Sequence, residues 1–395
     1  MIWDSRKQFN SMKKILGITG NRADYDLMAG LYSLLHSDLD IDFRLLVGGT
    51  HLSSQYGFTI NNIKKDGFKI LHQVESLIHS DSAQSRLKSA SIFLQNSVDV
   101  VGSWDPDIII YAGDREDVII GALLGVYLYT PTIHFFGGDH EKDGHPDTVI
   151  RQAASKLSTM HLVSHQIHKE RLISLGEPER RIEVIGSVAL DRFKKHRCSD
   201  VTQFFPKDKS LRGFALVIYH PLDPLIENPT QTYMNIISSL KHHDIPAILI
   251  YPNSDPGSES VIRLIEEFSA TSNFWGIPNF DRQTFLSLFK SARFLIGNSS
   301  AGIIEAASIP KAVINVGTRQ LGRFADENVL FCSQHLNAII EAISCALQEN
   351  FQKNLSTIKN SYGDGNSCER AYKIIKDSDL LKMQRKTEDS LLSVK

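Results

Sequence analysis

Acidic side chains gather in two stretches in the first half of the chain, residues 113–117 and 134–151. In the first stretch Asp114 and Arg115 follow an apolar run, and Arg115 is a candidate substrate-binding residue. The acids of the second stretch that we select are Asp139, Glu141 and Asp147. Crowded carboxyl groups raise one another's pKa, so that one of them can donate a proton near neutral pH. These acids are therefore candidates for acid–base chemistry, with Asp114 first, although a solvated, capped turn is the alternative for 113–117.

Asp147 and Arg151 are spaced four residues apart, which places them on one face of a helix, where they can pair. Three histidines lie nearby, at positions 134, 140 and 145. Their spacing fits no compact metal-ligand set, so we predict no metal site and no cofactor.

Small and basic residues in three turns suit a phosphorylated ligand. The turn Gly297–Gly302 follows a strand and opens a helix, where unpaired N–H groups attract anions, and it offers Ser299 and Ser300. Arg319 and Gln320 lie in the turn 317–323, and Arg22 lies in the turn after the first strand. An arginine fork can bind a diphosphate with two hydrogen bonds. The alternatives are ordinary helix caps, with Asp24 capping the first helix, and a solvated loop.

Three further polar residues are candidate contacts. Glu305, about one and a half turns into the helix after the serine turn, can accept bonds from ribose hydroxyls. His220 and Asn253 each end a predicted strand of the second half, in turns whose Pro, Gly and Asn content turn chemistry alone also explains.

β-branched runs alternate with helical segments such as Tyr25–Leu35 and Ala83–Val101, which favours parallel sheets. The predicted strands are Lys14–Thr19, Ile41–Val47, Ile108–Ala112, Thr132–Phe136, Met160–Val163, Ile182–Ile185, Phe214–Tyr219, Ala247–Tyr251, Phe274–Gly276, Phe294–Ile296, Ala312–Val316 and Val329–Phe331. We predict two doubly wound α/β domains facing a central cleft. Their bounds are a tail at 1–12, a catalytic domain at 13–190, a linker at 191–210, a nucleotide-binding domain at 211–376, and a C-terminal helix or tail at 377–395.

Composition excludes several classes of protein. The net charge of −2 argues against nucleic acid as a partner, and no apolar run approaches the ~18 residues that span a bilayer. The four cysteines have no paired spacing and read as isolated thiols of a reducing compartment. The N-terminus lacks the pattern of a secretory signal. We therefore expect a cytoplasmic enzyme that does not bind a membrane.

Together these motifs resemble the hydrolysing UDP-N-acetylglucosamine 2-epimerase family, which includes UDP-N,N'-diacetylbacillosamine 2-epimerase and the epimerase half of the enzyme that starts sialic acid synthesis. The resemblance runs from about residue 13 to 375. Its segments are Asn21–Tyr25, Gly113–Arg115, Gly137–Arg151, Lys156–Ser158, Leu175–Glu177, Pro252–Ser258, Gly297–Gly302 and Gly317–Arg323. It implies Rossmann-like domains in a glycosyltransferase-B-like arrangement and a homo-oligomer, either a dimer or a tetramer.

The resemblance implies elimination of UDP across C1 and C2, followed by addition of water to the glycal and return of a proton to the opposite face of C2. Arg22, Ser299, Ser300 and Arg319 would then hold the diphosphate, and Glu305 the ribose. Asp114, Asp147 and an acid of the 134–141 turn would move protons, Arg151 would orient Asp147, and His220 and Asn253 would contact sugar or phosphate.

One position departs from the family pattern, because Phe136 stands where many members have an acid. Asp139 or Glu141 would then take over that role, and a phenyl ring slightly favours a 6-deoxy diacetamido sugar over N-acetylglucosamine. Two other functions share the same motifs: a two-domain glycosyltransferase that uses a UDP-sugar, and a sugar-nucleotide-binding protein with impaired catalysis.

Overall fold

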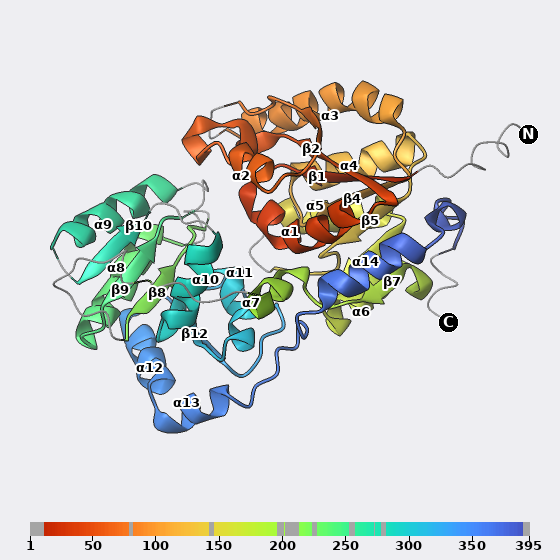
Figure 1. Cartoon of the computed structure of the whole chain (residues 1–395). Coiled ribbons are helices and arrows are strands. Elements are labelled where there is room, and N and C mark those ends of the chain that lie inside the picture. Colours follow the sequence, from red (N-terminus) through yellow and green to blue (C-terminus); the bar gives the residue numbers. More distant parts are fainter. Residues whose placement is uncertain are drawn as a thin grey trace, which may run out of the picture. The chain divides into compact units, whose positions relative to one another are not determined.

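The computed structural model describes residues 12–78, 82–141, 146–195, 201, 213–222, 227–252, 257–271, 273–277 and 282–389. The chain forms two compact units (Figure 1). The first unit takes the described parts of Met1–Asp139, Pro146–Asp191 and Gly365–Lys395. The second takes those of His140–His145 and Arg192–Asp364.

The first unit is built on a parallel seven-stranded sheet in the order β3-β2-β1-β4-β5-β6-β7. Its strands are β1 (Lys13–Thr19), β2 (Ile41–Val47), β3 (Ile70–Gln73), β4 (Ile108–Ala112), β5 (Thr132–Phe135), β6 (Met160–Val163) and β7 (Ile182–Val184). The six strands predicted in this half are confirmed to within a residue or so. The edge strand β3 was missed, because four residues of mixed polarity carry no strand signal. The strand order reverses between β1 and β4, where ligands of doubly wound sheets bind.

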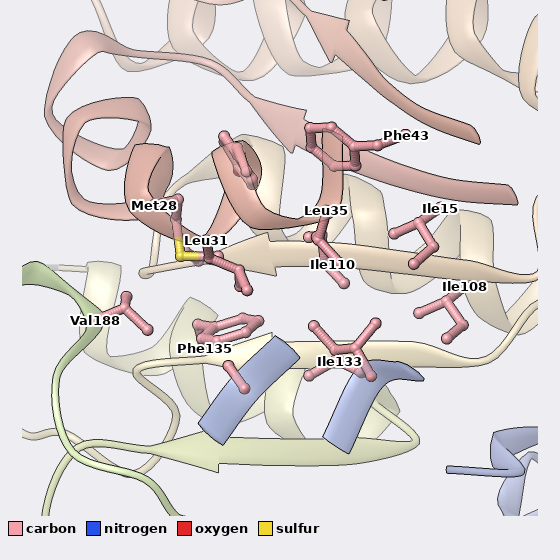
Figure 2. Packing of buried hydrophobic residues seen from close by; sticks show 14 of the residues in the cluster. Ile15, Met28, Leu31, Leu35, Phe43, Ile108, Ile110, Ile133, Phe135 and Val188 are labelled. Atoms are coloured by element: carbon pink, nitrogen blue, oxygen red, sulfur yellow. The ribbon is translucent and has the colours of Figure 1, made fainter. Parts of the chain in front are cut away.

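Helices cover both faces of this sheet. They are α1 (Arg22–Ser37), α2 (Ile60–Lys65), α3 (Ala83–Trp104), α4 (Glu116–Tyr127), α5 (Pro146–Leu157), α6 (Gln166–Ser174) and α14 (Ser367–Asp377). The short helix α7 (Asp191–Lys195) begins at the last residue of this part of the first unit and continues into the second. Figure 2 shows the core on one face, where Leu31 of α1 lies among Ile110 and Phe135 of the sheet. Burial of these side chains fixes the strand ends, and hence the loops that follow them.

Helix α14 returns the end of the chain to the first unit. It lies beside α1 (Figure 1). Its apolar face, formed by Cys368, Ala371 and Ile375, is buried in the same core as α1. Asp191 accepts hydrogen bonds from the backbone N–H groups of residues 367 and 368, at 3.0 and 2.8 Å. Residues 365–376 therefore lie outside the second domain in which the sequence analysis placed them, because this helix buries its apolar face in the first unit.

The second unit contains a parallel six-stranded sheet in the order β10-β9-β8-β11-β12-β13. Its strands are β8 (Ala215–Ile218), β9 (Ala247–Ile250), β10 (Phe274–Ile277), β11 (Phe294–Gly297), β12 (Ala312–Val316) and β13 (Val329–Cys332). Its helices are α8 (Pro229–His242), α9 (Ser258–Thr271), α10 (Arg282–Ser291), α11 (Ser300–Ile304), α12 (Leu336–Ala346) and α13 (Glu349–Leu355). All six predicted strands of this half are confirmed. Of the predicted linker 191–210, only 191–195 and 201 lie within the described residues, and 191–195 form α7.

Both units also contain short 3-10 helices, at Gly49–Leu52, Ser54–Tyr56, Glu179–Arg181, Val188–Leu190, Ala306–Ser308 and Leu380–Met383. No helix within the described ranges is both long enough and apolar enough to cross a membrane.

The C-terminal segment after α14 is held by buried charges of the first unit. Arg181, only 1% exposed, donates to the backbone oxygens of residues 383 and 385 and pairs with Glu388. The ammonium of Lys386 lies 2.6 Å from Oε2 of Glu177, which also lies 3.1 Å from Nε2 of His161. Burial acts to raise the pKa of Glu177, but the hydrogen bond from His161 and the charge of Lys386 lower it to about 2.

We expect this lowered pKa to make the first unit sensitive to acid. A carboxyl whose folded-state pKa lies below its ordinary value of 4.5 stabilises the fold above that pH. The contribution is lost as the pH falls from about 4.5 towards 2. The variant Glu177→Gln should be less stable than the wild type at pH 7, and its stability should change less between pH 5 and pH 3.

Urea denaturation at pH 7, 5 and 3 measures this change. Glu179→Gln is the matched control, because Glu179 forms an exposed ion pair with Lys169 on the same segment. Identical pH dependence in both variants would show that the Glu177 cluster contributes nothing to acid stability.

Candidate active site

The loop after β4 is held in place by a neutral histidine. Nε2 of His134 lies 2.9 Å from the carbonyl oxygen of Gly113, and Nδ1 lies 3.0 Å from Oγ of Ser155. Burial lowers the pKa of His134 to about 3, so the ring is neutral. A carbonyl only accepts, so Nε2 carries the proton and Nδ1 accepts from the serine hydroxyl. His134 thus positions the residue before Asp114.

Asp114 and Asp139, both predicted from the sequence, share one arginine. Arg151 of α5, only 2% exposed, donates from Nη2 to Oδ2 of Asp114. Its Nη1 lies 4.0 Å from a carboxylate oxygen of Asp139, and Nε2 of His168 lies 3.4 Å from the other oxygen. These contacts gather Asp114, Asp139 and Arg151 at the carboxyl edge of the first sheet.

Asp147, at the start of α5, is contacted by an arginine that the sequence analysis did not select. Nη2 of Arg86 on α3 donates to Oδ1 of Asp147 at 2.9 Å, and Nε of the same guanidinium donates to Glu116. The spacing of Asp147 and Arg151 suggested a pair on one helix face, whereas the ion pair of Arg151 described above is with Asp114. No local pattern points to Arg86, which lies 61 residues before Asp147.

Two more carboxyl groups lie at this edge and were not selected. Oδ2 of Asp117, in the first turn of α4, accepts from the backbone N–H of Gly20 at 3.0 Å. Burial raises the pKa of Asp117 to about 6. Burial, followed by the charges of Asp117 and Asp114, raises the pKa of Asp24 well above its ordinary value. Asp117 can therefore carry a proton near neutral pH, and Asp24 holds its proton more tightly than an ordinary aspartate.

The first helix is capped by Asn21, whose side chain accepts from the backbone N–H of Asp24 at 3.0 Å. The alternative in which Asp24 itself is the cap is therefore wrong. Arg22 is the first residue of α1, and Arg115 is the N-cap residue of α4. Both predicted binding arginines thus lie at helix starts along the same sheet edge, where an anion is favoured.

The serine turn of the second unit packs tightly against the neighbouring strand β8. Gly297 has φ of 138°, and a Cβ there would lie 2.0 Å from the carbonyl oxygen of Ile218, so only glycine fits. Ser299 is the N-cap of α11, accepting from the N–H of residue 301 at 3.3 Å, and Ser300 is the first helical residue. Helix α11 ends at residue 304, so Glu305 lies at its C-cap and not further inside a longer helix.

Asn298 joins three of the predicted site segments. Its side chain accepts from the backbone N–H of His220 at 2.7 Å and donates to the backbone oxygen of the same residue at 2.8 Å. Its backbone oxygen accepts from Nη1 of Arg319 at 3.2 Å and from Nε2 of Gln320 at 2.9 Å. The serine turn, the end of β8 and the turn 317–323 therefore meet at one residue of the second unit.

Two predicted site residues, Gln320 and Glu141, are bound by Arg323 of the turn 317–323. Gln320 is fully buried, and besides its bond to Asn298 its Oε1 accepts from Nη1 of Arg323 at 2.8 Å. Arg323 also pairs with Glu141, and both side chains of this pair are largely buried. Glu141 therefore has an arginine partner in the second unit, whereas Asp139 lies with Asp114 and Arg151 in the first.

Asn253, predicted to contact sugar or phosphate, lies outside the described residues. Within the described ranges no group of three histidine, cysteine, aspartate or glutamate side chains is arranged to hold a metal ion.

Comparison with known proteins identifies the family. The family model for UDP-N-acetylglucosamine 2-epimerase matches residues 34–376. The chain is 33% identical, over 92% of its length and 96% of the relative, to UDP-N,N'-diacetylbacillosamine 2-epimerase (hydrolyzing) of Legionella pneumophila. It is 31% identical, over 93% of its length and 94% of the relative, to polysialic acid biosynthesis protein P7 of Escherichia coli. The chain belongs to the UDP-N-acetylglucosamine 2-epimerase family, and it is an enzyme of that family.

Solved structures agree with the predicted fold class. A UDP-GlcNAc 2-epimerase of Neisseria meningitidis bound to UDP-GlcNAc matches with a TM-score of 0.78 at 18% identity, over 92% of this chain and all of that one. At this identity the match shows the fold alone. The two doubly wound parallel sheets of a glycosyltransferase-B-like fold are confirmed.

We expect the loss of Arg86 to lower kcat without changing the affinity for UDP. Arg86→Met removes a charge-assisted hydrogen bond to Asp147, worth about 1.5 kcal/mol at the low end, so kcat for UDP release from a UDP-sugar should fall about tenfold. Affinity for UDP should stay the same, and Arg86→Lys should restore part of the rate. Lys88→Met, an exposed change on the same helix, is the control. A KM effect with unchanged kcat would contradict this role.

Proposed function

We propose that the protein is a hydrolysing sugar-nucleotide 2-epimerase. It converts UDP-N-acetylglucosamine or a UDP-2,4-diacetamido-2,4,6-trideoxyhexose to UDP and the free sugar inverted at C2. The observation that supports this best is the ion pair between Arg151 and Asp114, with Asp139 beside it, at the carboxyl edge of the first sheet. Family membership and relatives whose names include "hydrolyzing" support it further.

The reaction separates into two steps that conserve atoms. In the first step a carboxylate takes the proton from C2, the C1–O bond breaks with its electron pair leaving on UDP, and a C1=C2 glycal remains. In the second step water adds its oxygen to C1, and a proton returns to the opposite face of C2. The sum is UDP-sugar plus water giving UDP plus free sugar.

The acids of the first unit are proposed to move these protons. The guanidinium of Arg151 pairs with Asp114, and that of Arg86 pairs with Asp147, so each carboxylate is held in one place at the sheet edge. Asp139 rather than Glu141 is the proposed replacement for the acid absent at Phe136, because Glu141 is paired with Arg323. The raised pKa of Asp117 suits a nearby group that exchanges a proton near neutral pH.

The second unit is proposed to hold the nucleotide. Ser299, Ser300 and Arg319 supply hydroxyl, backbone N–H and guanidinium donors for the diphosphate, arranged before the charge develops on the leaving UDP. Arg22 and Arg115 are proposed to add positive charge at the helix starts of the first unit, and His220 to contact sugar or phosphate.

The diacetamido sugar is the favoured substrate of the two. Phe136 has φ of 64°, a region that bulky residues rarely adopt, and its ring packs against the apolar core of the first unit. An apolar side chain at this position suits a 6-methyl group better than a hydroxyl. The similarity to the Legionella pneumophila relative supports the same choice. The product is proposed to feed nonulosonic acid synthesis in the cytoplasm, in keeping with the free thiols of the described cysteines.

Incubation with both UDP-sugars in D₂O tests the proposal. Mass spectrometry and NMR of the products should show UDP, without any acceptor, and a free manno-type sugar with one deuterium at C2. Sugar transferred to an added acceptor would establish the glycosyltransferase instead, and tight UDP binding without turnover would establish an impaired binding protein. A C2 that keeps its original hydrogen would exclude epimerisation.

A further inference from the structure

Glu305 carries a buried carboxylate at the end of the serine-turn helix. The residue is 5% exposed, and a carboxylate in such a place is costly unless it is paired. Nη2 of Arg192 lies 2.5 Å from its Oε2, and both residues belong to the second unit. The sequence analysis selected Glu305 but not this partner, which lies 113 residues earlier in the chain.

The guanidinium of Arg192 is itself held in place by two rings. Its central carbon lies 5.5 Å from the centroid of the Phe193 ring and 6.0 Å from that of Phe285 on α10. A planar guanidinium stacks on aromatic faces while keeping its N–H fork for a carboxylate. The donor to Glu305 therefore has a defined direction and is not a mobile surface cation.

The bond from Arg192 leaves acceptor capacity on Glu305. A carboxylate has two oxygens and about four lone-pair sites. Within the described part of the chain, the hydrogen bond found for this side chain uses Oε2, so Oε1 can accept from a ligand. With Oε2 fixed, rotation of the carboxyl group is restricted and Oε1 keeps one direction.

We propose that Arg192 is a positioning residue that orients Glu305, so that Oε1 accepts a hydrogen bond from a ribose hydroxyl of the bound nucleotide. This inference rests on the proposed function, which assigns the nucleotide to the second unit. Arg192 itself does not touch the ligand. Its effect is therefore specific to the ribose hydroxyls, whereas a purely structural role would weaken binding of every nucleotide equally.

Calorimetry with UDP and 2',3'-dideoxy-UDP separates these two roles. The wild type should bind UDP about tenfold more tightly than the dideoxy nucleotide, since a hydrogen bond to a charged group is lost. In Arg192→Met the ratio of the two affinities should fall to about one, mainly through weaker UDP binding. Arg192→Lys should recover part of the ratio, and it provides a second variant should the methionine variant fail to fold.

Lys194→Met is the matched control, because this lysine is exposed on the same short helix. It should keep the wild-type ratio. If Arg192→Met and Arg192→Lys both keep that ratio, Arg192 does not orient Glu305, even if both variants bind UDP weakly. If the wild type binds UDP but not in preference to dideoxy-UDP, the ribose role of Glu305 is wrong. If it binds no UDP at all, the proposed function fails, and this inference fails with it.

Discussion

Asp114→Asn should slow the release of UDP by roughly 10²–10⁴-fold, the usual contribution of a general acid or base. Asparagine keeps the size of the side chain and one oxygen that can accept from Arg151, but it cannot take a proton. Because the nucleotide is proposed to bind the second unit, its affinity should remain nearly unchanged. The loss should therefore appear in kcat and not in the dissociation constant of UDP.

Single-turnover assays and UDP calorimetry on the same preparation measure both quantities. Thermal denaturation checks that the variant still folds, since a buried arginine such as Arg151 is strongly destabilising when it loses its charged partner. Asp99→Asn, at an exposed position of α3, is the control for a neutralised carboxylate and should behave as the wild type. If Asp114→Asn and Asp147→Asn both turn over normally, the epimerase mechanism is wrong and the glycosyltransferase takes its place.

Arg319→Ala should weaken UDP binding by roughly 1.5–3 kcal/mol, the range for a hydrogen bond to a charged group, which is about 10–150-fold. The guanidinium is anchored through Nη1 to the backbone oxygen of Asn298, next to Ser299, so its other N–H groups have a fixed position beside the serine turn. Alanine removes both the charge and this anchor.

The comparison for this loss is Arg263→Ala, which removes an exposed arginine from α9 of the same unit. Calorimetry at two salt concentrations should show the larger salt dependence in the wild type, because a diphosphate contact by a cation is screened. Unchanged affinity in Arg319→Ala would remove this residue from the nucleotide site.

The sequence by itself determined the two parallel sheets and most of their strands. Runs such as Ile108–Ala112 and Ala312–Val316 are wholly buried, so their apolar character marks them without any knowledge of their neighbours. The positions that follow them were predictable too, because parallel strands bring their carboxyl ends to one edge. Asp114 and Arg319 were selected as candidates in this way. Gly297 was found as part of the turn, but the reason for a glycine there is tertiary, because a side chain would collide with the carbonyl oxygen of Ile218 on the neighbouring strand β8.

Only the tertiary structure decided which charged side chains meet. The partners of Asp147 and Glu305 are Arg86 and Arg192, and each lies on a helix remote in the chain. Long, flexible side chains reach over several ångströms, so no periodicity records such a pair.

Burial is the other property that only the folded chain decides. Asp117 reads as an ordinary first-turn acid, and its raised pKa follows from the protein that surrounds it. Helix α14 has the apolar face of any amphipathic helix, and the sequence does not say which unit will bury it. That choice depends on which surface is left uncovered once the sheets have formed, and α1 and its sheet provide that surface in the first unit.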